Sequence, residues 1–147
     1  FHRVLWDHAI DPKENSFIKL KKSNKIRKVI LCSGKVYFDL LEAREKLKKD
    51  DVVIYRIEQL YPFPIKSLVK EIKVYRKNAK FYWCQEEPKN MGAWFSVRDY
   101  IQWTLGYIGA NNREISYIGR SPAASPATGY AKRHIAQQKE IIENVFN

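Results

Sequence analysis

Residues 29–34 read Val29-Ile30-Leu31-Cys32-Ser33-Gly34, a short apolar run that ends in a small polar turn. Apolar runs of this length are typical of strands that are buried on both faces of a parallel sheet. The apolar residues that follow recur at the spacing of one helix face: Val36, Leu40, Ala43 and Leu47. A buried strand that leads through a glycine turn into an amphipathic helix predicts the first half of a strand–helix–strand unit.

The same alternation continues to the end of the chain. Apolar runs predict further strands at residues 52–57, 81–84 and 115–118, and helical spacing predicts helices at residues 65–72, 94–105 and 135–145. Residues 17–20 would add a short edge strand. We therefore predict an α/β fold of three layers, in which a mainly parallel sheet of four or five strands has helices on both faces.

The length of 147 residues and a hydrophobic content of 45% suit one domain with its own core. Turn-forming and lysine-rich residues predict that residues 1–26 are a lead-in segment or linker from a preceding domain, and that residues 27–147 form the α/β domain. The chain starts at Phe1 without the features of a signal peptide, and no apolar run approaches the roughly 20 residues of a membrane-spanning helix. We expect a chain that begins inside a longer protein and does not enter a membrane.

The formal net charge of +11 raises the alternative of a free-standing basic domain that binds nucleic acid. One expected helix carries a lysine stripe typical of such a surface, made of Lys66, Lys70, Lys73 and Lys77. A solvated helix face explains the same stripe. The aromatic residues that would stack on bases fall mostly within expected strands and core stripes, which argues against single-strand binding.

The two cysteines, Cys32 and Cys84, each end an apolar run, where a buried thiol behaves as a small hydrophobic side chain. They provide no disulfide network, and His2, His8 and His134 lack the spacing of metal ligands. We expect unreactive free thiols, an intracellular protein and no metal site.

Polar residues gather where the expected strands end, and in a parallel sheet these ends meet at one edge that commonly binds ligands. At Ser33-Gly34-Lys35, a tight turn exposes backbone N–H groups at a helix start and Lys35 adds charge, which suits a phosphate group. Arg120, at the end of the last strand, would reach the same anion. Alternatively, Gly34 only turns the chain and Lys35 is solvated. The Gly-x-x-x-x-Gly-Lys pattern of nucleotide-cleaving enzymes is absent.

A second polar stretch, Glu86-Glu87-Pro88, leaves the strand predicted at residues 81–84. Neighbouring strand residues point to opposite sides, so Glu86 and Glu87 should not share a proton as a catalytic pair would. We expect these carboxylates to accept hydrogen bonds from the loop or from a neighbouring subunit. Pro88 and Gly92 would fix the shape of the loop, and Trp94 would lie at an interface. No residue is assigned a catalytic role.

Four segments at these strand ends carry a family resemblance. They read Cys32-Ser33-Gly34-Lys35-Val36-Tyr37-Phe38-Asp39-Leu40, Arg56-Ile57-Glu58-Gln59-Leu60-Tyr61-Pro62-Phe63, Trp83-Cys84-Gln85-Glu86-Glu87-Pro88-Lys89-Asn90-Met91-Gly92-Ala93-Trp94, and Gly119-Arg120 with Ser125-Pro126-Ala127-Thr128-Gly129-Tyr130 and His134. In this order they resemble the C-terminal domain of the decarboxylating component of 2-oxoglutarate dehydrogenase. The resemblance covers residues 27–146.

The resemblance implies a transketolase-type C-terminal domain. In that family thiamin diphosphate and magnesium are bound by other domains, partly through a Gly-Asp-Gly segment that does not occur in this sequence. We therefore expect no cofactor in this chain and no decarboxylation by the chain alone. Its implied role in this oxidoreductase of the tricarboxylic acid cycle is to complete the dimer and shape the cleft near its own loops.

The resemblance also implies partners. These are the rest of the same polypeptide, a homodimer partner and the lipoyl succinyltransferase component of the complex. An anion at the Lys35 corner would be the nucleotide AMP or acetyl-CoA, bound as a regulator. The expected location is the bacterial cytoplasm or the mitochondrial matrix, and the substrate is 2-oxoglutarate or its one-carbon-longer homologue, 2-oxoadipate.

Overall fold

The structure is a computed structural model that describes residues 3–11, 18–124 and 131–147. Its sheet has five strands in the order β1-β3-β2-β4-β5. The strands are β1 (Val4–Leu5), β2 (Lys28–Cys32), β3 (Val52–Ile57), β4 (Lys80–Pro88) and β5 (Ile115–Arg120). β2, β3, β4 and β5 are parallel and β1 is antiparallel to β3. The predicted α/β fold with a mainly parallel sheet is confirmed.

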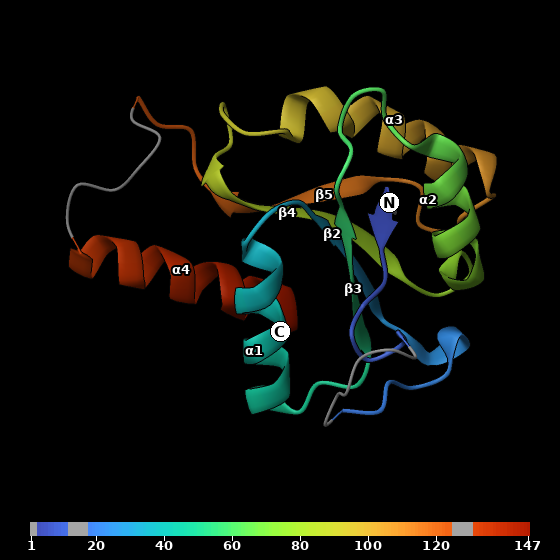
Figure 1. Cartoon of the computed structure of the whole chain (residues 1–147), viewed down its shortest axis with the longest axis horizontal. Coiled ribbons are helices and arrows are strands. Elements are labelled where there is room, and N and C mark those ends of the chain that lie inside the picture. Colours follow the sequence, from blue (N-terminus) through green and yellow to red (C-terminus); the bar gives the residue numbers. More distant parts are fainter. Residues whose placement is uncertain (1–2, 12–17, 125–130) are drawn as a thin grey trace.

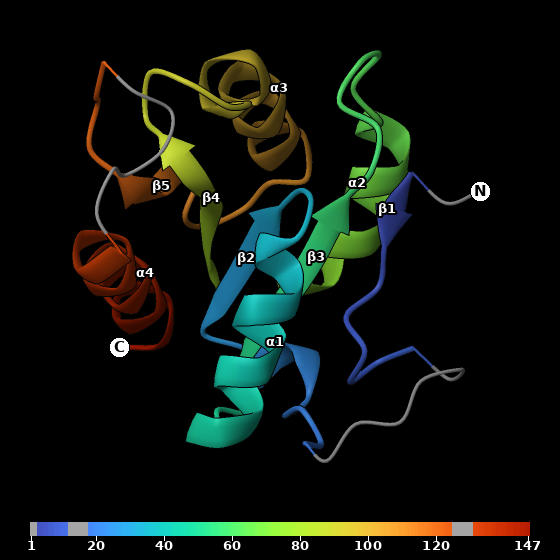
Figure 2. The same cartoon turned by 60° about the vertical axis from the view of Figure 1, so that its left-hand side comes forward.

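Helices cover both faces of the sheet and make a three-layer structure (Figures 1 and 2). They are α1 (Val36–Leu47), α2 (Ile65–Ile72), α3 (Trp94–Tyr107) and α4 (Ala131–Phe146), with short 3-10 turns η1 (Ser23–Lys25) and η2 (Lys73–Tyr75). One core cluster lies between the sheet and α2 and α3, and the other lies between the sheet and α1 and α4. Every residue of β2 is buried, as its apolar sequence predicts for the middle of such a sheet.

The edge strand of the sheet comes from a different place than the sequence predicts. Val4 pairs with Ile57 and Leu5 with Arg56, whereas residues 18–20 are not in a strand and Phe17 lies outside the described residues. The prediction of a strand there is therefore wrong for residues 18–20. Residues 4 and 5, which fall in the expected lead-in segment, form the edge strand of the sheet instead. Val4 is buried in this position.

Helix α4 packs against the sheet mainly through its carboxyl-terminal end, where Ile141, Val145 and Phe146 are buried. Arg27 Nη1 donates to the carbonyl of Asn147 at 3.0 Å, and Lys28 Nζ donates to that of Asn144 at 3.1 Å. Cations suit the carbonyl end of a helix because they meet its negative dipole end. Residues 131–136, by contrast, are all exposed, so the start of α4 extends beyond the core. The preceding segment, residues 125–130, carries part of the family resemblance and lies outside the described residues.

Candidate functional site

The Ser33-Gly34-Lys35 turn joins β2 to α1 at the carboxyl edge of the sheet, as predicted. Gly34 has φ of 79°, a backbone conformation that favours glycine. The side chain of Lys35 is largely exposed, and its Nζ lies 3.2 Å from Glu86 Oε2. The hydrogen bond to Glu86, followed by the charge of that residue, raises the pKa of Lys35. A carboxylate of the chain itself therefore occupies the position that the sequence analysis gave to a bound anion.

Glu86 also joins a carboxyl pair that the sequence analysis missed. Gln138 Nε2, on α4, lies 3.3 Å from Glu86 Oε1 and 3.4 Å from Asp39 Oδ2, on the first turn of α1. Burial, followed by the charge of Glu86, raises the pKa of Asp39 against the lowering effect of Lys35. Polar side chains of β4, α1 and α4 therefore contact one another in this cluster. Glu87, the next residue along β4, takes no part in it and is exposed.

The loop between β4 and α3 is organised by Gln85, which is only 3% exposed. Its Oε1 accepts hydrogen bonds from Trp83 Nε1 at 3.0 Å and from the backbone N–H of Trp94 at 3.1 Å. Its Nε2 donates to three carbonyls, those of Glu87 and Pro88 at the end of β4 and that of Met91 in the loop. Gly92 has φ of 67°, and a Cβ there would stand 3.1 Å from Gln85 Oε1. Pro88 and Gly92, the residues predicted to shape the loop, thus lie beside one buried amide. Trp94, predicted to lie at an interface, is 5% exposed in this chain and joins the same network through its backbone N–H.

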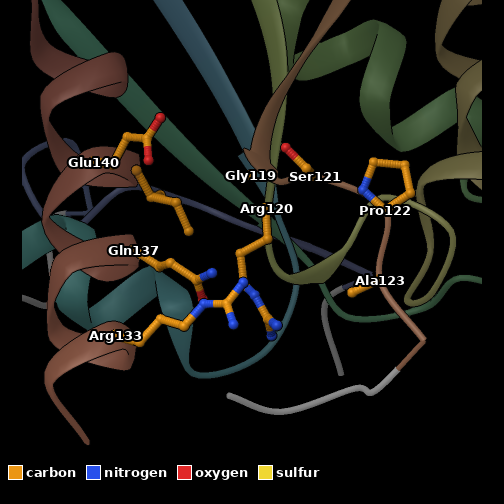
Figure 3. A pocket seen from close by; sticks show the side chains of 9 residues that line it. Gly119, Arg120, Ser121, Pro122, Ala123, Arg133, Gln137 and Glu140 are labelled. Carbon is orange, nitrogen blue, oxygen red and sulfur yellow. The ribbon is translucent and has the colours of Figure 1, made fainter. Parts of the chain in front are cut away.

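A pocket of about 210 Å³ opens between the end of β5 and α4 (Figure 3). It is lined by Gly119, Arg120, Ser121, Pro122, Ala123, Arg133, Gln137, Glu140 and Ile141. Figure 3 shows Arg120 from β5 and Arg133 from α4 extending into the same space. Guanidinium groups bind phosphate and carboxylate through paired hydrogen bonds, so this lining can hold an anion. Glu140 and Gln137 add an acceptor and an amide on the α4 side.

The structure thus places the predicted anion-binding residues in two neighbouring places on the same edge. Arg120 lines the pocket, whereas the described lining includes neither Ser33, Gly34 nor Lys35. Sequence reasoning missed Arg133, Gln137 and Glu140. Their spacing of i, i+4 and i+7 along the last helix was the available signal, because it places all three side chains on one helix face.

The described residues do not fit a magnesium diphosphate group. No three His, Cys, Asp or Glu side chains within residues 3–11, 18–124 and 131–147 are grouped as metal ligands. Two neighbouring asparagine side chains, which could otherwise offer oxygen ligands, hold a loop: Asn111 Nδ2 donates to the carbonyl of Lys77 at 2.9 Å and Asn112 Nδ2 to that of Ala79 at 3.1 Å. These bonds close a loop near the start of β5, on the opposite edge from the pocket.

Both cysteines are free and buried, as the sequence predicts. Burial raises the pKa of Cys32 well above its ordinary value and that of Cys84 to about 12. Neither thiol is therefore a nucleophile at neutral pH. Within the part of the chain that the structure describes, no helix has the length and apolar character needed to cross a membrane.

Comparisons with known proteins agree with the family resemblance. A family model described as "2-oxoglutarate dehydrogenase C-terminal" matches residues 1–146. The proteins named "2-oxoglutarate dehydrogenase E1 component" from Brucella anthropi, Brucella ovis and Brucella melitensis are each 53% identical over 146 residues, which is 99% of this chain. The chain spans 14% of the length of these relatives. Because the family match and the high identity both extend over nearly the whole chain, the chain belongs to the 2-oxoglutarate dehydrogenase C-terminal family.

Proposed function

We propose that this chain acts as the C-terminal part of a thiamin-diphosphate-dependent 2-oxoglutarate dehydrogenase E1 component. The identity of 53% to the Brucella E1 components over 146 residues carries this proposal. In it the remainder of the polypeptide binds thiamin diphosphate and magnesium, decarboxylates 2-oxoglutarate and passes the succinyl group to a lipoyl succinyltransferase partner. This chain alone is inactive. The comparisons give the nucleic-acid alternative no support. The location that goes with this function is the bacterial cytoplasm or the mitochondrial matrix.

The proposed share of this chain in the assembled enzyme is structural and regulatory. The end of β4 and the loop after it support dimer assembly and the cleft, since Gln85 fixes their shape and leaves Glu87 exposed for a neighbouring subunit. The pocket at Arg120 and Arg133 binds AMP or acetyl-CoA through their phosphate groups, because two guanidinium groups face one space. The Ser33-Gly34-Lys35 turn is a second anion contact on the same edge, where a ligand competes with Glu86 for Lys35.

Thermal unfolding of the chain tests the regulatory site directly. The melting temperature is measured alone and with AMP, acetyl-CoA or magnesium thiamin diphosphate, each at two salt concentrations. A ligand at 100 times its Kd stabilises a protein by about 2.7 kcal/mol, which corresponds to about 5–10 °C for a chain of this size. We expect a shift with AMP or acetyl-CoA and none with magnesium thiamin diphosphate.

A pair of arginine variants assigns the shift to the pocket. Arg120→Met should reduce it strongly, because Arg133 alone then faces the anion, whereas Arg98→Met, which removes a half-exposed arginine from α3, should leave it unchanged. No shift of the unsubstituted chain with AMP or acetyl-CoA would contradict the regulatory part of the proposal. The structural part is tested separately by grafting the chain into the Brucella anthropi E1 component in place of the matching 146 residues, where the dimer and its activity should be retained.

A further inference from the structure

The end of β5 is offset from its neighbour by an irregularity in the sheet. Cys84 of β4 pairs with Ile118 of β5, but the next pair joins Pro88 to Arg120. Three residues of β4 therefore stand opposite Gly119 alone. Irregularities of this kind bend a strand and redirect the side chain that follows. Here the residue that follows is Arg120, and its side chain extends into the pocket beside α4 (Figure 3).

The backbone of Arg120 is held in place by two hydrogen bonds to its carbonyl oxygen. Its carbonyl oxygen accepts hydrogen bonds from the Tyr117 hydroxyl at 2.7 Å and from the backbone N–H of Lys89 at 3.1 Å. The same hydroxyl lies 3.3 Å from the carbonyl oxygen of Glu87. Burial raises the pKa of Tyr117 to about 12, so the hydroxyl keeps its proton and remains a donor at neutral pH. One phenol group thus joins the end of β5 to the end of β4.

The position of that hydroxyl depends on close packing around it. The Tyr117 ring packs against Trp94 with 5.3 Å between centroids, and Lys89 Nζ lies 5.4 Å from the centroid of the Tyr117 ring. Gly119 leaves room for the hydroxyl, since a Cβ there would collide with it and come within 2.7 Å of the Gln85 carbonyl oxygen. The ring is absent from the described lining of the pocket. Tyr117 can therefore affect a ligand only indirectly, and its hydrogen bond to the Arg120 carbonyl provides such a route.

We propose that Tyr117 is a positioning residue for anion binding, which holds the backbone of Arg120 so that its guanidinium group is already directed into the pocket. This inference rests on the proposed anion site and deepens it. A preorganised arginine loses less conformational freedom when a ligand binds, and so binds the ligand more tightly. The hydroxyl of Tyr117 contributes to affinity without touching the ligand.

Tyr117→Phe tests the proposal because it removes the hydroxyl and keeps the ring. Calorimetric titration with AMP and with inorganic pyrophosphate should show binding weakened about three- to tenfold, the loss expected for one hydrogen bond. Tyr107→Phe is the matched control, because Tyr107 is 67% exposed on α3 and away from the pocket lining. The control should bind both ligands as the unsubstituted chain does.

A double-mutant cycle separates positioning from general loss of structure. Once Arg120→Met has removed the guanidinium group, adding Tyr117→Phe should change the affinity no further. Losses that multiply instead would overturn the proposal, as would equal binding by Tyr117→Phe and the unsubstituted chain. If the unsubstituted chain binds neither AMP nor pyrophosphate, the anion site itself is refuted, which is a different result.

A spectroscopic measurement applies even where Tyr117→Phe lowers stability. The Nε–H group of Arg120 can be followed by nuclear magnetic resonance and assigned by its loss in Arg120→Met. In the unsubstituted chain it should behave as an ordered group, and in Tyr117→Phe its heteronuclear Overhauser effect should fall towards that of a mobile side chain. An unchanged effect in the variant would contradict the positioning role.

Discussion

Asp7 and Arg44 form an ion pair in which neither side chain is exposed to solvent. Arg44 Nη2 donates to Asp7 Oδ1 at 2.6 Å, and Arg44 Nη1 donates to Asp7 Oδ2. The same carboxylate accepts the backbone N–H of Ile54 at 2.8 Å and that of Ala9 at 2.8 Å. The pair fastens the segment after β1 to α1 and β3, so residues near the amino end of the chain belong to the fold of this domain.

Removing one partner of this pair should be strongly destabilising. Asp7→Ala leaves the Arg44 charge buried without its carboxylate, which costs about 3–5 kcal/mol in comparable proteins. The free energy of unfolding, measured by urea denaturation, should fall by this amount. Replacing both charges with apolar residues, as in Asp7→Leu with Arg44→Met, should recover much of the loss. A loss below about 1 kcal/mol for Asp7→Ala would show that the pair does not hold the segment in place.

The sequence predicts the parts of the fold whose signal is local. The apolar run of β2 is buried as expected, and so are Val36, Leu40 and Ala43 of the α1 stripe, whereas Leu47 at the end of that stripe is 50% exposed. β1 has only two residues, Val4 and Leu5, which are too few to show any periodicity. What stabilises the segment that follows is the pairing of Asp7 with Arg44, which lies 37 positions further along the chain. No local pattern in a sequence encodes such a contact.

The candidate site likewise has a part that the sequence predicts and a part that it does not. The strand ends that carry Lys35, Glu86 and Arg120 are predictable, because a parallel sheet brings them to one edge. Their individual partners are not, since Gln138 and Arg133 reach the edge from a helix whose position depends on tertiary packing. Gln85, a polar residue in the sequence, is buried because five polar groups of the loop and its flanks converge on its amide.

Alanine substitutions at two glycines should measure how much stability depends on the packing around Gln85 in the loop after β4. Gly34 and Gly92 both have positive φ, but a Cβ at Gly34 meets nothing within 4 Å, whereas one at Gly92 stands 3.1 Å from Gln85 Oε1. Gly34→Ala should therefore cost only the backbone strain, about 1–2 kcal/mol. Gly92→Ala should cost measurably more by urea denaturation, because the Gln85 network must also shift. Equal losses would mean that the loop adapts freely around an added methyl group.

The stability of the chain should depend on pH through Asp39. Burial and the charge of Glu86 raise its pKa above 3.8, despite the opposing charge of Lys35. The folded chain therefore keeps a proton on Asp39 at pH values where the unfolded chain has lost it. This contribution to stability is complete below pH 3.8 and is lost as the pH rises through the higher pKa of the folded state.

Asp39→Asn should accordingly raise the free energy of unfolding at pH 7 and flatten its pH dependence above pH 3.8. Urea denaturation between pH 4 and pH 7 measures both effects, within about the range in which carboxyl groups titrate. Asp99→Asn is the matched control, because the side chain of Asp99 is 86% exposed on α3. If the two variants respond alike to pH, the buried surroundings of Asp39 are not responsible.

Glu86 should weaken anion binding, because it holds Lys35 as a ligand would. Glu86→Gln removes the competing charge, and the affinity for AMP should rise about two- to fivefold, the range expected from an exposed ion pair. The gain should shrink at high salt, which screens exposed charges. Glu114→Gln removes an exposed carboxylate near the start of β5, so it makes the same change in net charge and should give a smaller gain.

Two Lys35 variants test whether Lys35 is the group that Glu86 competes for. Adding Lys35→Met to Glu86→Gln should cancel the gain, and Lys35→Glu alone should abolish the AMP-induced shift in melting temperature. If Glu86→Gln and Glu114→Gln tighten binding equally, the effect comes from net charge and Lys35 makes no contact with the anion.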